Sequence, residues 1–219
     1  MNKNKTKNIV KKILLWYGKN KRDFPWRYTK DPYRIMIAEF MLHRTRAGQV
    51  VSVYENFIKK YSDVYKLSRA RSENIKQVTQ HLGLHWRSSH FIEAAKYIVK
   101  NYNSSFSDTA DDLLKIPGIG EYIAGAILTV CFNKPYPVVD ANVARFVNRF
   151  YGLNLTGEIR RKKEIINIAK QLFNTVDPGK YLFAIIDFTT MICKPRNPGH
   201  ENCMIKDDCK YFKSATNNK

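Results

Sequence analysis

The sequence lacks any apolar run of the roughly 20 residues that a membrane-spanning helix needs, and it is poor in acidic side chains. Lys and Arg number 38 against 19 Asp and Glu, which gives a formal net charge of +19 over 219 residues. The N-terminal stretch MNKNKTKNIVKKILLWYGKN is interrupted by lysines and lacks the continuous apolar segment of a signal peptide. We therefore expect no membrane association and an intracellular location, in the cytoplasm or nucleoid. The excess positive charge predicts a polyanionic partner, and nucleic acid is the first candidate.

The sequence also lacks a convincing strand pattern and an internal repeat. Apolar residues recur instead at helical spacing, and Asp31-Pro32 is a good helix start because Asp caps a helix and Pro tolerates its first turn. The fold class is therefore predicted to be all-α. Helices are predicted over residues 8–18, 32–43, 46–61, 71–81, 86–102, 109–115, 121–133, 140–151, 161–175 and 178–192.

The stretch from Leu113 to Phe150 contains a tight turn, Pro117-Gly118-Ile119-Gly120, between two predicted helices. Its two glycines allow a sharp turn and leave the amides at the start of the next helix uncovered, where the helix dipole also favours a phosphate group. Asp140 follows the apolar run Pro137-Val138-Val139 and precedes a helix with apolar residues at i, i+3, i+4 and i+7. An ordinary helical hairpin, with Asp140 as a plain helix cap, is the alternative interpretation.

This stretch resembles the helix-hairpin-helix-Gly/Pro-Asp motif of the endonuclease III superfamily of DNA glycosylases, in which the hairpin grips one DNA strand. The resemblance extends over nearly the whole chain and implies an endonuclease III-like fold of two helical modules that binds double-stranded DNA. It implies a six-helix module over residues 31–134 and a discontinuous module over residues 1–30 plus 135–219, with the DNA-binding cleft between them. Gly118 and Gly120 are the expected DNA contacts of the hairpin. Nothing in the sequence indicates a stable oligomer, so we expect a monomer.

Two residues near the turn carry the chemistry that the resemblance implies. Asp140 is the expected catalytic carboxylate, which stabilises positive charge on the sugar as the base leaves. Tyr122 stands two residues beyond Gly120, where strand-cutting members of the superfamily carry a lysine. Tyrosine cannot form a Schiff base. A tyrosine at this position resembles the Mig-type thymine-DNA mismatch glycosylases, whereas adenine-removing relatives tend to carry serine there. The resemblance thus implies a monofunctional enzyme that leaves an abasic site; an aromatic packed at the helix start is the alternative for Tyr122.

The run Ile37–Thr45 looks like the branch shared by mismatch adenine and mismatch thymine glycosylases. Glu39 aligns with the carboxylate that protonates adenine in the first group, and a solvated glutamate on a helix face is the alternative. His43 and Arg44 are expected DNA contacts, and Arg44 matches the side chain that fills the hole left by the flipped nucleotide. Leu84 matches an apolar wedge on the opposite side of the groove.

The C-terminal segment has the spacing of a metal-binding loop. It reads Cys193-x6-His200-x2-Cys203-x5-Cys209, and a reduced compartment favours metal over disulfides at clustered cysteines. The family's iron–sulfur loop has four cysteines at these intervals, so His200 takes the place of the second. The resemblance therefore implies a [4Fe-4S] cluster, whose potential an imidazole ligand raises. Zinc also suits three Cys and one His. In a third alternative, His200 is a surface residue and the loop binds a three-cysteine cluster or no metal. The expected role of the metal is structural.

We predict a DNA glycosylase of base excision repair that removes thymine and uracil opposite guanine in mismatched double-stranded DNA. The first rival is an adenine glycosylase acting on A opposite G or 8-oxoguanine. Tyr122 counts against it, as does the end of the chain soon after Cys209, which leaves no room for the further domain of such enzymes. The second rival is a non-catalytic DNA-binding module. Asp140 argues against it, because binding to a polyanion gains nothing from a carboxylate in the groove.

Overall fold

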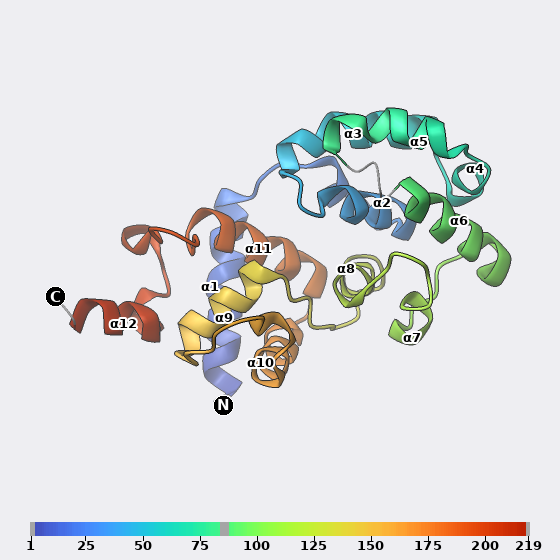
Figure 1. Cartoon of the computed structure of the whole chain (residues 1–219). Helices are drawn as coiled ribbons and strands as arrows, with labels where there is room; N and C mark the ends of the chain where they lie inside the picture. The colour runs from blue at the N-terminus through green and yellow to red at the C-terminus, as the bar shows by residue number, and fades with distance from the viewer. Residues whose placement is uncertain (1–2, 84–87, 218–219) are drawn as a thin grey trace. The chain divides into compact units, whose positions relative to one another are not determined.

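The computed structural model describes residues 3–83 and 88–217 (Figure 1). Every regular element in these residues is a helix, which confirms the predicted all-α class. The chain divides into two compact units, one formed by Met1–Arg22 with Asn133–Lys219 and the other by Asp23–Phe132. In the described residues, no helix combines the length and the apolar character needed to cross a membrane.

The unit formed by the two chain ends is built around α9. This helix packs against α10, α11 and α12, and α1 packs against α10 and α11. The apolar residues predicted to share one face of α9 are all buried, and the Phe146 ring meets the Phe188 ring of α11 edge-on at 6.0 Å between centroids. The elements are α1 (Lys3–Asn20), α9 (Ala141–Tyr151), η4 (Ile159–Arg161), α10 (Lys163–Phe173), α11 (Pro178–Met191), η5 (His200–Asn202), η6 (Lys206–Asp208) and α12 (Lys210–Asn217).

In the other unit, α8 packs against α2 and α7 and is buried from Ala124 to Val130, as its nearly continuous apolar sequence requires. Helix α2 packs against α3 and α8, and α6 packs against α4 and α5. The Phe91 ring lies 5.2 Å from Phe40 and 5.3 Å from Phe57. The elements are η1 (Pro25–Tyr28), α2 (Pro32–Leu42), α3 (Ala47–Lys60), α4 (Val64–Ser68), α5 (Ser72–Thr79), η2 (Gln80–Leu82), α6 (Ser88–Tyr102), α7 (Ala110–Leu113) and α8 (Glu121–Phe132).

Aspartate side chains cap several helices at their N-termini. The carboxylate of Asp31 accepts the amide of Tyr33 at 2.9 Å, and those of Asp63 and Asp177 accept the amide three residues further on at 2.8 Å. Each cap satisfies an amide that lacks an acceptor within the helix. The predicted helix start at Asp31-Pro32 is therefore confirmed.

The sequence prediction misses two helices, α4 and α12. Helix α4 has only five residues, too few to show helical periodicity, and the cap at Asp63 starts it. Helix α12 follows the cysteine-containing segment and packs on α9. The Lys210 side chain there lies 2.9 Å from the position of a Cβ at Gly152. Helix α12 thus makes tertiary contacts that the local sequence pattern does not reveal.

A buried ion pair fixes the end of α1. Asp187 of α11 is fully buried and accepts two hydrogen bonds from Arg22, one from the backbone amide at 3.0 Å and one from Nε at 2.6 Å. The Arg22 side chain is 29% exposed. Because a buried carboxylate is tolerated only when it is paired and hydrogen-bonded, this contact ties the chain after α1 to α11.

Replacing Asp187 by Asn should lower the free energy of unfolding by about 2–3 kcal/mol, because it leaves the Arg22 guanidinium without its counter-charge. Urea denaturation measures this change. The matched control is Glu158→Gln, which removes the partner of Arg160 in an exposed ion pair and should leave the denaturation midpoint unchanged. Equal midpoints for both variants would contradict the role assigned to the buried pair.

Candidate active site

Asp140 lies immediately before α9, in extended backbone, with a half-buried side chain. Its Oδ1 accepts the amides of Asn142 at 2.9 Å and Val143 at 2.7 Å, and its Oδ2 accepts the Nδ2–H of Asn142 at 2.8 Å. Three N–H donors thus fix the plane of the carboxylate, and the positive end of the helix dipole lies at the same point. The arrangement holds a carboxylate in one orientation at a helix N-terminus.

A second set of hydrogen bonds connects Asn142 to the first cysteine of the predicted metal loop. Arg145, one turn further along α9, donates from Nη1 to Oδ1 of Asn142 at 3.0 Å. Its Nη2 donates to the carbonyl oxygens of Cys193 at 2.9 Å and Thr189 at 3.0 Å. The side chain that orients Asp140 is therefore itself held by an arginine bound to the backbone at Cys193.

The turn after α7 has different requirements at its two glycines. Gly118 has φ +82°, and a Cβ there would lie 3.2 Å from the Cβ of His90 and 3.3 Å from the Phe40 ring. Gly120 is not among the glycines with positive φ, and nothing lies within 4 Å of its Cβ position. Only Gly118 is thus required by the fold. Ile119 between them is buried and anchors the turn in the core.

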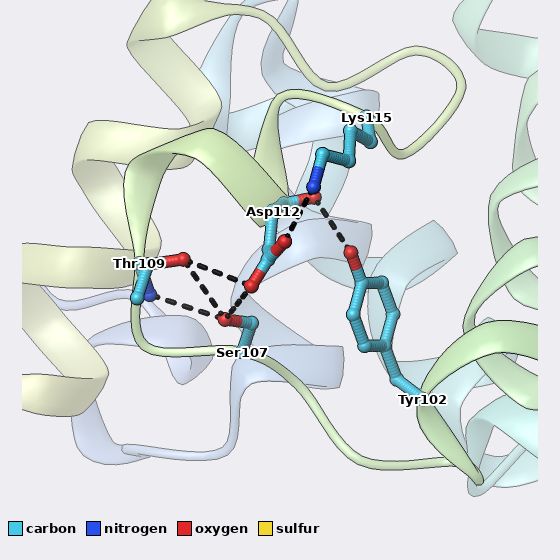
Figure 2. Close-up of polar contacts among 5 residues, drawn as sticks. All are labelled: Tyr102, Ser107, Thr109, Asp112 and Lys115. Atoms are coloured by element: carbon cyan, nitrogen blue, oxygen red, sulfur yellow. Dashed lines mark hydrogen bonds and ion pairs between the residues drawn. The ribbon is translucent and has the colours of Figure 1, made fainter.

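Polar contacts brace the entry to this turn (Figure 2). Asp112 of α7 accepts hydrogen bonds from Ser107 at 3.0 Å, Thr109 at 3.0 Å and Lys115 at 2.8 Å, and the Tyr102 hydroxyl donates to its carbonyl oxygen at 3.3 Å. The hydrogen bond from Lys115, followed by those from the two hydroxyls, lowers the pKa of Asp112 to about 2. The charged carboxylate therefore joins Ser107 and Thr109 to Lys115 before the turn, while the backbone carbonyl oxygen of Asp112 makes the contact to Tyr102 at the end of α6.

The remaining predicted residues of this unit lie on α2, on α8 and beyond the end of α2. Glu39 of α2 is only 8% exposed, so the alternative of a solvated glutamate is wrong. Tyr122 is half-buried in the first turn of α8. His43 and Arg44 are exposed after α2, and Arg44 has φ +62°, in the left-handed region. The predicted wedge residue Leu84 lies outside the described residues.

Four candidate ligands line one cavity beside α9: Cys193, His200, Cys203 and Cys209. Its empty volume, including space open to solvent, is about 380 Å³, and its walls include aromatic rings of α9, α11 and α12. Burial raises the pKa of the Cys203 thiol to about 11 and also raises that of Cys209. Cysteine sulfur and histidine nitrogen are ligands of both iron–sulfur clusters and zinc, so the residue types that line this cavity suit either metal group.

The four side chains share the lining of the cavity with ten other residues and are not drawn together into a coordination site. In the described part of the chain, no three or more His, Cys, Asp or Glu side chains are arranged to hold a metal ion. The other cysteine, Cys131, lies on α8, where burial raises the pKa of its thiol to about 12.

The prediction from sequence omits the polar residues of α9, Asn142, Arg145 and Arg149. Arg145 and Arg149 are spaced i, i+4 on the helix and both contact the backbone of residues 193–195. This spacing can be read from the sequence, and it places both arginines on the side of the helix away from the predicted apolar face. Which segment this polar side would meet is not visible, because the loop it contacts lies more than forty residues further along the chain.

The sequence profile of the HhH-GPD superfamily of base excision DNA repair proteins matches residues 37–175, a span that includes the hairpin and Asp140. The chain belongs to this family. As an HhH-GPD protein it is a DNA glycosylase of base excision repair, which confirms the predicted family and enzyme class.

Relatives cover nearly the whole of this HhH-GPD protein. A thymine/uracil-DNA glycosylase of Methanothermobacter thermautotrophicus is 30% identical, over 97% of this chain and 96% of its own length. A solved structure of a thermostable thymine-DNA glycosylase has a TM-score of 0.90 and 31% identity, covering 96% of this chain and 98% of that chain. Endonuclease III in a trapped covalent complex with DNA, at 18% identity and a TM-score of 0.78 over 99% of both chains, shares the fold. Adenine DNA glycosylases match as well; this chain spans 38% of the one from Arabidopsis thaliana, at 29% identity.

The two glycines of the hairpin should respond differently to alanine. Gly118→Ala should cost about 1–3 kcal/mol of stability, because a left-handed backbone and two close contacts both oppose a Cβ. Gly120→Ala should leave thermal stability unchanged, because its Cβ meets nothing within 4 Å, but it should weaken binding to duplex DNA several-fold if a phosphate approaches the turn just before α8. Fluorescence anisotropy and thermal unfolding give the two readouts. Normal DNA affinity in Gly120→Ala would argue against a phosphate contact at the turn.

Proposed function

We propose that this HhH-GPD protein removes thymine and uracil from T·G and U·G mismatches and leaves an abasic site. The oriented carboxylate of Asp140 is the observation that carries the chemistry. The near-full-length similarity to thymine/uracil-DNA and thymine-DNA glycosylases supports the choice of base. Double-stranded DNA with a mismatch is the proposed partner of an intracellular monomer.

Asp140 is proposed to act on the sugar. A glycosylase must first extrude the target nucleotide, because the bond to C1′ is inaccessible within the base stack. Positive charge then develops on the sugar as the base departs, and a fixed carboxylate stabilises it or directs water to it. With Oδ1 engaged by two backbone amides, Oδ2 of Asp140 is the oxygen assigned to this role.

Tyr122 is proposed to set the reaction subtype. A phenol cannot form the imine through which a lysine at this position would cleave the strand. The product is therefore an abasic site in an intact strand, and strand breaks should appear only after alkali. Tyr122 also weighs against an adenine glycosylase function. The similarity to adenine DNA glycosylases makes that function the second candidate.

Glu39 and Arg44 are proposed to assist at the base itself. Glu39 is a buried acid on α2, and we assign it to the protonation of the departing pyrimidine through a water. Arg44 is held in the left-handed region at a cost of about 1–2 kcal/mol. We propose that this backbone directs its side chain, with His43 beside it, to the hole left by the flipped nucleotide. Leu84 keeps its proposed role as the opposing wedge.

A [4Fe-4S] cluster held by Cys193, His200, Cys203 and Cys209 is the proposed cofactor. The four donors line one cavity and keep the intervals of the family's iron–sulfur loop, which favours the cluster over zinc. When bound, the cluster would fix the loop that carries Lys194, Arg196 and Lys206 for contact with the DNA backbone. No step of base removal is assigned to it.

Replacing Asp140 by Asn separates catalysis from capping. Asparagine is as good a helix cap as aspartate, so Asp140→Asn should remain folded and bind DNA normally. Loss of the charge should slow thymine release from a T·G duplex by about 100-fold or more. Single-turnover base release measures the rate.

The matched control is Asp177→Asn, which changes the aspartate cap of α11 in the same unit. It should release thymine at the wild-type rate. Equal rates for Asp140→Asn and Asp177→Asn would mean that Asp140 is only a cap.

A further inference from the structure

The guanidinium of Arg149 contacts the sulfur of Cys193, the first cysteine of the loop. Its Nη1 lies 3.9 Å from the Sγ of Cys193, within hydrogen-bonding distance for sulfur. The same guanidinium donates to the carbonyl oxygens of Lys194 at 2.6 Å and Pro195 at 2.8 Å, and it stacks over the Tyr211 ring at 4.7 Å. Four separate contacts therefore fix one positive charge in the cavity wall.

The backbone of Arg149 meets the same cavity from a second direction. The thiol of Cys209 donates to the Arg149 carbonyl oxygen at 3.9 Å, a hydrogen bond that lasts only while the sulfur keeps its proton. One residue of α9 thus contacts the first and last cysteines of the loop. Arg145, one turn earlier, donates to the carbonyl oxygens of Thr189 and Cys193 and to Oδ1 of Asn142, and its charge also interacts with the Cys193 side chain. Arg149 differs from Arg145 in that its guanidinium has a contact of 3.9 Å to the Cys193 sulfur and is also held by the Lys194 and Pro195 carbonyl oxygens and the Tyr211 ring.

We infer that Arg149 is a positioning residue that raises the reduction potential of an iron–sulfur cluster bound in this cavity. The inference rests on the proposed cluster. Adding one electron to a cluster adds negative charge, and a guanidinium fixed beside a ligand sulfur stabilises that charge. Hydrogen bonds to sulfur act in the same direction. The effect adds to that of His200, which replaces a charged thiolate with a neutral imidazole.

Three variants of the full chain, purified without oxygen, test this inference. Arg149→Gln removes the charge and keeps an N–H donor, whereas Arg149→Lys keeps the charge and loses the planar fork. Lys170→Met is the matched control, since it removes one positive charge from α10 outside the cavity lining. Iron content and absorption establish that each protein holds the cluster, and protein-film voltammetry, in which the electrode supplies the single electron, gives the midpoint potential.

Arg149→Gln should shift the ratio of oxidised to reduced cluster about tenfold toward the oxidised form at a fixed potential, which is about 59 mV for one electron. Arg149→Lys should shift it less, and Lys170→Met should leave it unchanged. If Arg149→Gln does not fold, Tyr211→Leu replaces it, because loss of the ring beneath the guanidinium should shift the potential in the same direction.

Two negative results can be told apart. Wild-type protein that contains zinc or no metal would overturn the proposed cluster and this inference with it. Four irons with the same potential in wild type, Arg149→Gln and Tyr211→Leu would overturn the role of Arg149 alone. Base release by Asp140→Asn tests the enzymatic proposal independently of both.

Discussion

The hydrogen bonds that fix the carboxylate of Asp140 at the start of α9 are the constraint on which the proposed chemistry depends. A carboxylate can stabilise positive charge on a sugar only if it is held in place before that charge develops. Two backbone amides and the side chain of Asn142 hold it here. Asn142 is held by Arg145, and Arg145 by the carbonyl oxygen of Cys193, so hydrogen bonds connect the cysteine loop to the carboxylate that we propose as catalytic.

Helix α9 combines three physical roles on different parts of its surface. Its apolar face, including Phe146 and Phe150, is buried in the core of its unit. Its N-terminus carries Asp140, and its polar side carries two arginines that bind the backbone of the loop. The Asp140 carboxylate and the loop are thus both bound by residues of this one helix.

The sequence was sufficient to predict features that depend on local chemistry. The all-α class, the capped start at Asp31 and the apolar face of α9 follow from residue types and helical spacing. The family and the enzyme class followed from the resemblance of the hairpin and Asp140 to a known motif. The proposed roles of Tyr122 and Arg44 remain predictions.

Features that depend on long-range packing could not be predicted in the same way. Spacing alone did not indicate that the arginines of α9 face residues 193–195, nor that Glu39 is buried. The hairpin glycines looked equivalent in the sequence, but only Gly118 has positive φ and close neighbours, because Phe40 and His90 reach it from elements distant in the chain. The contact of α12 with α9 is likewise a feature that the local sequence pattern does not show.

Base release from matched duplexes containing T·G, U·G, A·G or A opposite 8-oxoguanine, each assayed with and without alkali, is the most direct test of the proposed function. Release from T·G and U·G, with strand breaks only after alkali, is the predicted result. Release from the adenine-containing duplexes alone would contradict the choice of substrate, and strand breaks without alkali would contradict the role assigned to Tyr122.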